Sequence, residues 1–157
     1  MVYKKILVAL DQTSAGKAVF EQALDLAKKD NAKLMVFHSL PLEHENLGSY
    51  TDLYGQNLTH YSQAMHQHLE KESASTREWL SEFCDRANNE GVATEWDWRI
   101  GDAGRSIREL ASSWGADLIV VGRRGRQGLS EMFLGSVSNH VIHNAACSVL
   151  VVQGIGD

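Results

Sequence analysis

Five short stretches with the character of β-strands are spaced along the chain, and they constrain the fold more than any other feature. They lie at residues 6–10, 34–37, 92–98, 118–121 and 149–152. Four of them are continuous apolar runs, which is typical of strands covered on both faces in a parallel sheet. The third alternates apolar and polar side chains, which indicates a strand with one wetter face. Together they predict a largely buried parallel sheet.

The stretches between these strands carry the periodicity of amphipathic helices. Apolar residues recur at helical spacing over 15–29 and 59–90, and shorter helices are expected after Asp102 and near Val137. Strict alternation of strand and helix predicts an α/β fold, namely an open, five-stranded, doubly wound parallel sheet with helices on both faces. Ligands of such sheets bind at the carboxyl ends of the strands, so the residues that follow the strands are the first candidates for a site.

Length and composition predict a single domain over residues 1–157, with no internal repeat or linker. Residues 41–58 lose the periodicity and are expected to form a loop insertion. The formal net charge of −5 argues against a nucleic-acid-binding surface. No apolar run approaches the roughly 20 residues that span a bilayer, so no membrane partner is expected. Cys84 and Cys147, without a secretory signal, predict reduced thiols and a cytoplasmic location.

A glycine-rich segment follows the fourth predicted strand. Gly122 and Gly125 allow the backbone to turn sharply and approach a ligand, because glycine has no Cβ. Gly135 and Ser136 begin the last predicted helix, where unpaired N–H groups and the helix dipole favour an anion. Ser138 adds a second hydroxyl donor beside Ser136. The segment also carries permanently charged guanidinium groups that can neutralise phosphate oxygens, at Arg123, Arg124 and Arg126.

The spacing of this segment is G-x2-G-x9-G-S. It is not the G-x-x-x-x-G-K-[ST] of a P-loop, nor the G-x-G-x-x-G of a dinucleotide-binding loop. The two glycine-containing parts therefore predict a phosphate-binding loop of another type, and with it the binding of ATP or a closely related nucleotide.

Several segments outside the glycine loop match the pattern of a known family. Residues 3–11 form an opening strand with a terminal aspartate, 37–39 end the second strand, 116–122 form the fourth strand, and 144–152 form a closing turn and strand. With these segments and the G-x2-G-x9-G-[ST] signature, the chain resembles the nucleotide-binding subgroup of the universal stress protein family. The similarity covers nearly the whole chain.

The resemblance implies a Rossmann-like sheet with the strand order 3-2-1-4-5 and an adenine nucleotide, ATP, ADP or AMP, as ligand. Asp11 would contact the adenosine part, and Ser39 would line the adenine pocket through its backbone. Mg²⁺ is expected to be held mainly through the phosphates. The complete set of expected nucleotide-binding residues is Ala9, Asp11, Ser39, Val121, Gly122, Arg124, Gly125, Gly135, Ser136, Val137 and Ser138.

The resemblance also implies an assembly and a role. A homodimer would form through the last strand, Val149 to Val152, which fits the need to cover an apolar sheet edge. The protein would act as a regulator or sensor of the stress response. Two alternatives stay open. One is a slow ATPase or adenylate-transferring enzyme using the same pocket, and the other is a dimeric scaffold that binds no nucleotide. No placed base or nucleophile indicates dedicated catalysis.

Several polar residues have a structural interpretation beside a functional one. Asp11 could cap a helix, although its place at the end of a strand favours contact with a ligand. For Asp102 the helix cap is the better explanation. His38 is interpreted as a hydrogen-bonded residue of the core or its rim. Trp96 and Trp98 are interpreted as core residues, and the helical histidines as a solvated face rather than a metal site, at His60, His66 and His68.

Overall fold

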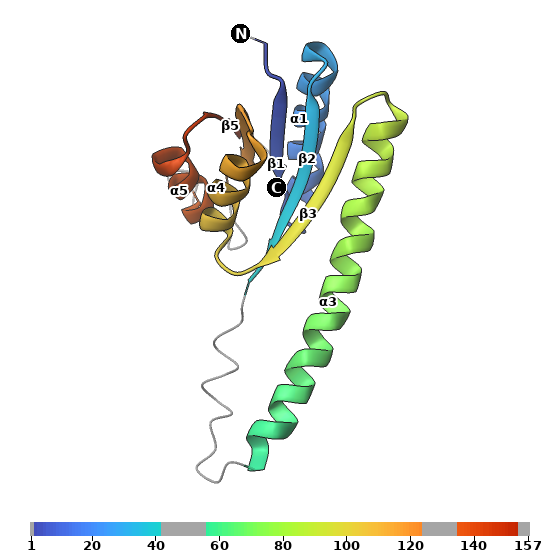
Figure 1. The fold of residues 1–157 in the computed structure, drawn as a ribbon, viewed down its shortest axis with the longest axis vertical. Helices are drawn as coiled ribbons and strands as arrows, with labels where there is room; N and C mark the ends of the chain where they lie inside the picture. Colours follow the sequence, from blue (N-terminus) through green and yellow to red (C-terminus); the bar gives the residue numbers. More distant parts are fainter. Residues whose placement is uncertain (1, 42–55, 124–134, 154–157) are drawn as a thin grey trace.

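The computed structural model describes residues 2–41, 56–123 and 135–153, which build a five-stranded parallel sheet (Figure 1). The strands are β1 (Lys5–Ala9), β2 (Lys33–Leu40), β3 (Thr94–Ile100), β4 (Leu118–Gly122) and β5 (Ser148–Val152). Their order across the sheet is β3-β2-β1-β4-β5, and every pairing is parallel. Both the predicted fold class and the predicted strand order are confirmed.

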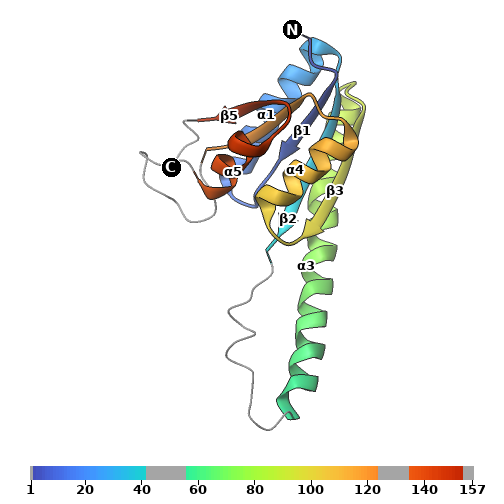
Figure 2. The ribbon, with the colours of Figure 1, turned by 60° about the vertical axis from the view of Figure 1, so that its left-hand side comes forward.

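Helices cover both faces of this sheet, as predicted. They are α1 (Ser14–Asp30), α3 (Gln56–Asn89), α4 (Ala103–Trp114) and α5 (Ser136–Asn144). Helices α1 and α3 pack on one face, while α4 and α5 pack on the other (Figures 1 and 2).

The loop insertion expected at residues 41–58 is wrong at its C-terminal end, because residues 56–58 already belong to helix α3. The last glycine of the insertion is Gly55, and the residues after it carry no helix breaker that would delay the helix. Residues 42–55, which make up most of the predicted loop, lie outside the described residues.

The two faces of the sheet are packed by alternate residues of the same strands. In β1, Ile6 and Val8 point to the face covered by α1 and α3, whereas Leu7 points to the face covered by α4 and α5. All three are fully buried. Burying an aliphatic side chain of this size contributes roughly 1.5–3 kcal/mol, so the central strands anchor the fold from both sides.

Local chemistry sets several helix boundaries, and the predicted start of a helix after Asp102 is confirmed. Asp102 caps α4, and its carboxylate accepts a hydrogen bond from the Arg105 N–H at 2.9 Å. Gly115 ends the same helix with φ 82°, a left-handed conformation that glycine adopts without strain. Gly91, with φ 88°, follows the end of α3 in the same way.

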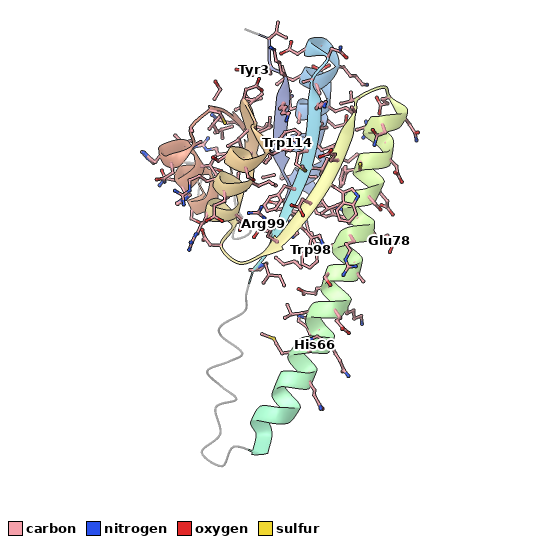
Figure 3. The ribbon with its side chains drawn as sticks, in the orientation of Figure 1. Tyr3, His66, Glu78, Trp98, Arg99 and Trp114 are labelled. Carbon is pink, nitrogen blue, oxygen red and sulfur yellow. The ribbon has the colours of Figure 1, made fainter. Side chains whose placement is uncertain are left out.

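Helix α3 is longer than the sheet that it covers. Its C-terminal half packs on β2 and β3, where Leu80 and Ala87 are fully buried. Trp98 of β3 packs against the same core, with the Arg77 guanidinium 5.6 Å from its ring centre (Figure 3). Core packing of the strand tryptophans is therefore confirmed. The N-terminal part of α3 projects past the carboxyl ends of the strands and carries His66 (Figures 1 and 3).

In residues 2–41, 56–123 and 135–153, none of the helices combines the length and the apolar character that a membrane crossing needs.

Candidate functional site

The carboxyl ends of β1 and β4 lie side by side at the centre of the sheet. Val8 of β1 pairs with Val120 of β4. The chain leaving β1 enters α1 on one face, and α5, the helix that follows β4, packs on the opposite face. A crevice between such diverging connections is where open α/β sheets bind ligands. The candidate site is therefore the crevice between the β1–α1 corner and the start of α5.

The two parts of the predicted phosphate loop meet at this crevice. The Gly135 N–H donates to the Arg123 carbonyl at 2.9 Å, and the Ser138 hydroxyl donates to the Gly122 carbonyl. Arg123 is also held from the other side, because its N–H donates to the Val152 carbonyl at 3.0 Å. Residues twelve or more positions apart in the sequence are thus joined into one backbone cradle. The arm between them, residues 124–134 with Arg124 and Gly125, lies outside the described residues.

The start of helix α5 carries backbone N–H groups of the kind that bind anions. Asn139 makes the first intrahelical hydrogen bond, donating to the Gly135 carbonyl at 2.9 Å. The N–H groups of Ser136, Val137 and Ser138 come before that bond, so the helix itself offers them no acceptor. Ser136 is exposed, whereas Ser138 is 3% exposed. With the positive end of the helix dipole, these N–H groups suit a phosphate.

The structure gives the Ser138 hydroxyl a different role from the one expected. The sequence suggested a hydroxyl donor to phosphate, but this hydroxyl donates to the Gly122 carbonyl instead. The physical reason for this hydrogen bond is burial. A buried hydroxyl without a hydrogen-bond partner costs free energy, and the Gly122 carbonyl lies within reach. Ser138 therefore holds the cradle together, and its backbone N–H is the group left to face a ligand.

Asp11 stands at the corner between β1 and α1, on the opposite side of the crevice. Its Oδ1 accepts hydrogen bonds from the Thr13 N–H, at 3.1 Å, and from the Thr13 hydroxyl. Thr13 is the N-cap residue of α1, but its own side chain makes no capping hydrogen bond. Within the described part of the chain, both of these hydrogen bonds are made to Oδ1. Asp11 therefore retains Oδ2 to accept a hydrogen bond from a ligand hydroxyl.

Gly16 is a residue of this corner that the sequence did not single out. A Cβ at this position would lie only 2.4 Å from the Asp11 carbonyl oxygen, so the first turn of α1 packs directly on the Asp11 backbone. One signal in the sequence could have identified it. Glycine in a helix costs about 1 kcal/mol relative to alanine, so a glycine in the first turn suggests that packing leaves no room for a Cβ.

The side chains of three other predicted site residues are engaged elsewhere in the structure. Val121 is 2% exposed and its side chain belongs to the core beneath α4 and α5. Ala9 packs against the same core. The Ser39 hydroxyl donates to the Gly101 carbonyl at 3.1 Å, so this side chain is directed to the connection between β3 and α4. The structure places Ala9, Asp11, Gly122 and Gly135–Ser138 at the carboxyl ends of the paired strands β1 and β4 or in the connections that follow them, with Ser39 on the neighbouring strand β2.

In the described ranges no cluster of side chains suits a metal ion, and the surroundings of both thiols disfavour the thiolate. No three histidine, cysteine, aspartate or glutamate side chains there are grouped to hold a metal ion. His66 and His68 instead pair with Glu70 and Glu72 along the exposed surface of α3, at 2.9 and 3.2 Å. Both cysteines are free, and burial raises the pKa of each thiol, with Asp85 adding to the rise at Cys84 and Asp117 at Cys147.

The fold and the cradle define a class of protein: a doubly wound, Rossmann-like α/β protein with a glycine-rich segment between its fourth strand and its last helix. Within this class, the chain belongs to the universal stress protein family, whose family model matches residues 2–153. The resemblance to this family seen in the sequence is confirmed.

One curated relative supports the family assignment, and two solved structures support the fold, each over 98% of the chain. The chain is 47% identical to the universal stress protein Sll1388 of Synechocystis over 153 residues, covering 98% of this chain and 99% of the relative. A crystal structure of a universal stress protein in complex with cAMP superposes with a TM-score of 0.67, at 24% identity and 98% coverage of both chains. The Archaeoglobus fulgidus universal stress protein in complex with dAMP has a TM-score of 0.61, at 22% identity, covering 98% of this chain and 100% of that one.

Proposed function

We propose that this protein binds an adenine nucleotide, ATP, ADP or AMP, in the crevice between the Asp11 corner and the start of α5. The proposal rests on the two hydrogen bonds that join the two parts of the loop. The Gly135 N–H donates to the Arg123 carbonyl, and the Ser138 hydroxyl donates to the Gly122 carbonyl. These bonds hold the first N–H groups of α5, which have no acceptor within the helix, beside the carboxyl ends of β1 and β4. Two family members of the same fold were solved with the adenine nucleotides cAMP and dAMP, which supports the choice of base.

The parts of the nucleotide would be divided between the two sides of the crevice. The phosphates would bind the N–H groups of Ser136, Val137 and Ser138, with Arg124 and Gly125 of the intervening arm beside them. The Asp11 carboxylate would accept from the adenosine part, and the backbone of Ser39 would line the adenine pocket. Mg²⁺ would be carried by the phosphates, because such ions keep most of their water and take few protein ligands.

The biological role that follows is regulation in the cytoplasm under stress. A bound nucleotide can change a protein's state only through its different affinity for two conformations. The arm between Gly125 and Gly135 and the surface of the dimer are the parts whose arrangement would depend on the nucleotide. Slow hydrolysis at this site is the enzymatic alternative.

The purified protein is expected to release adenine nucleotide when it is denatured, and to bind added ATP after the released nucleotide has been removed. Anion-exchange chromatography of the denatured supernatant identifies the nucleotide, and calorimetric titration gives the affinities for ATP, ADP and AMP. A sample with no bound adenine nucleotide and no ATP binding would leave the scaffold as the function. Turnover far below about one per second would count against a dedicated enzyme.

A homodimer through β5 is proposed together with this function. β5 is an edge strand, and Val149, Leu150 and Val151 are half-buried in the single chain. The Val152 carbonyl accepts from Arg123, so the backbone of Val152 faces β4 and that of Val151 faces the open edge. A second copy would pair with this edge.

Replacing Val151 by proline is expected to convert the dimer to a monomer and to leave the fold intact. Proline removes one outward N–H and is tolerated at sheet edges. Sedimentation velocity measures the assembly, and circular dichroism checks the fold. Glu95→Ala, in the opposite edge strand β3, is the matched control and should leave the assembly unchanged. A Val151→Pro protein that remains dimeric would place the interface elsewhere.

A further inference from the structure

His38 is a buried histidine beside the corner where Asp11 leaves strand β1. It lies near the carboxyl end of β2 and is 4% exposed. Its Nδ1 is 2.7 Å from the Leu10 carbonyl oxygen. Because a carbonyl oxygen can only accept, Nδ1 must carry the hydrogen and donate it. The Leu10 N–H in turn donates to the Phe37 carbonyl at 2.8 Å. Strand β2 therefore holds both backbone groups of Leu10.

The held carbonyl is the one that sets the direction of Asp11. The last paired residues of β1 and β2 are Ala9 and Phe37, so the chain is leaving the sheet at Leu10. The Leu10 carbonyl and the Asp11 N–H belong to one planar peptide unit, and fixing the first fixes the second. We propose that His38 is a positioning residue of the nucleotide site, whose Nδ1–H orients this peptide and with it the Asp11 carboxylate. The inference rests on the proposed nucleotide function.

Helix α3 packs against the His38 ring through Trp79. The Trp79 ring meets the His38 ring edge-on, with 5.3 Å between centroids and an angle of 84°. A second contact joins the same helix to the same corner, because the Gln12 side-chain amide lies 3.5 Å from the Thr76 hydroxyl. The Asp11 corner is thus tied to one turn of α3, and the imidazole has a packed partner that opposes its rotation away from Leu10.

Two substitutions separate the donated hydrogen bond from the packing. His38→Phe keeps an aromatic ring against Trp79 but removes the donor. His38→Asn removes the ring but keeps an N–H donor near the position of Nδ1. We expect His38→Phe to raise the Kd for ATP about tenfold and His38→Asn to remain within about threefold of wild type, the scale of one well-placed hydrogen bond.

Leu34→Val provides a control for stability alone. Leu34 is fully buried at the opposite end of the same strand, and the substitution should lower the Tm but leave the Kd within about twofold of wild type. All titrations are made well below each variant's Tm. If wild type binds ATP and His38→Phe binds it equally well, the inference is overturned and the proposed function stands.

A measurement without nucleotide tests the same geometry independently. The Thr13 N–H donates to Asp11 Oδ1 at 3.1 Å, so its hydrogen exchange reports whether the corner is formed. We expect this amide to exchange about tenfold faster in His38→Phe than in His38→Asn or Leu34→Val, since local opening sets such rates. Equal exchange rates would overturn the positioning role. If wild type binds no nucleotide, the proposed function fails, while the exchange rates still decide whether His38 holds the corner.

Discussion

Replacing Gly16 by alanine is expected to destabilise the protein and to weaken nucleotide binding. The added Cβ would lie 2.4 Å from the Asp11 carbonyl oxygen, a distance at which one of the two segments has to move. The obstructing atom belongs to the backbone, so no side-chain rotation relieves the contact. Overpacking of this kind costs about 1–3 kcal/mol. Either movement disturbs Asp11, because one segment carries it and the other begins at Thr13, which donates to its carboxylate. The Kd for ATP should therefore rise together with the loss of stability.

The sign of the change in the free energy of unfolding distinguishes this contact from the usual effect of helix propensity. Glycine to alanine within a helix ordinarily stabilises a protein by about 0.5–1 kcal/mol through helix propensity. A net loss therefore measures the contact with Asp11, whereas a gain would mean that the corner relaxes freely. Urea denaturation gives the free energy of unfolding, and calorimetry gives the affinity. Lys17→Ala is the matched control, because Lys17 is the exposed next residue of the same helix and should leave both values near wild type.

The sheet and its helices could be predicted because burial leaves a pattern in local sequence. Strands covered on both faces, such as β1 and β4, must be apolar at nearly every position, so they stand out in a mostly polar chain. Helix ends were predictable where one residue sets them, as with the Asp102 side chain and the left-handed Gly115. The start of α3 was missed because no single residue between Gly55 and Thr59 marks it.

Close approaches between individual residues left no comparable pattern in the sequence. Gly16 touches the Asp11 backbone, and a Cβ on Gly104 would lie 2.9 Å from the His140 ring of α5. The requirement for a residue without a Cβ at these two positions does not follow a helical or strand period. Each glycine therefore appears in the sequence only as an unfavourable helix residue. The Ser138 hydroxyl was assigned to a phosphate for the same reason, because its carbonyl partner on Gly122 is adjacent only after folding. The glycine spacing identified the cradle, but the bonds that close it required the structure.

Replacing Gly135 by valine is expected to abolish nucleotide binding while the chain stays folded. Gly135 has φ −61° and ψ 155°, values that valine also adopts, so the backbone is not strained. The position is buried, however, and its N–H donates to the Arg123 carbonyl at 2.9 Å. A branched side chain adds volume at this buried joint between Arg123 and the first turn of α5, and we expect the added volume to separate the two parts of the cradle. We expect the Kd for ATP to rise at least about a hundredfold, which corresponds to about 2.7 kcal/mol.

Two further variants connect this effect to the cradle. Asn139→Ala alters an exposed side chain in the next turn of α5 but keeps the backbone bond to Gly135, so its affinity should match wild type. Gly135→Ala adds one methyl group and should give an intermediate Kd with an unchanged circular dichroism spectrum. A graded loss from glycine to alanine to valine, at constant fold, is what a backbone cradle requires. ATP binding of wild-type strength in Gly135→Val would instead remove the start of α5 from the site.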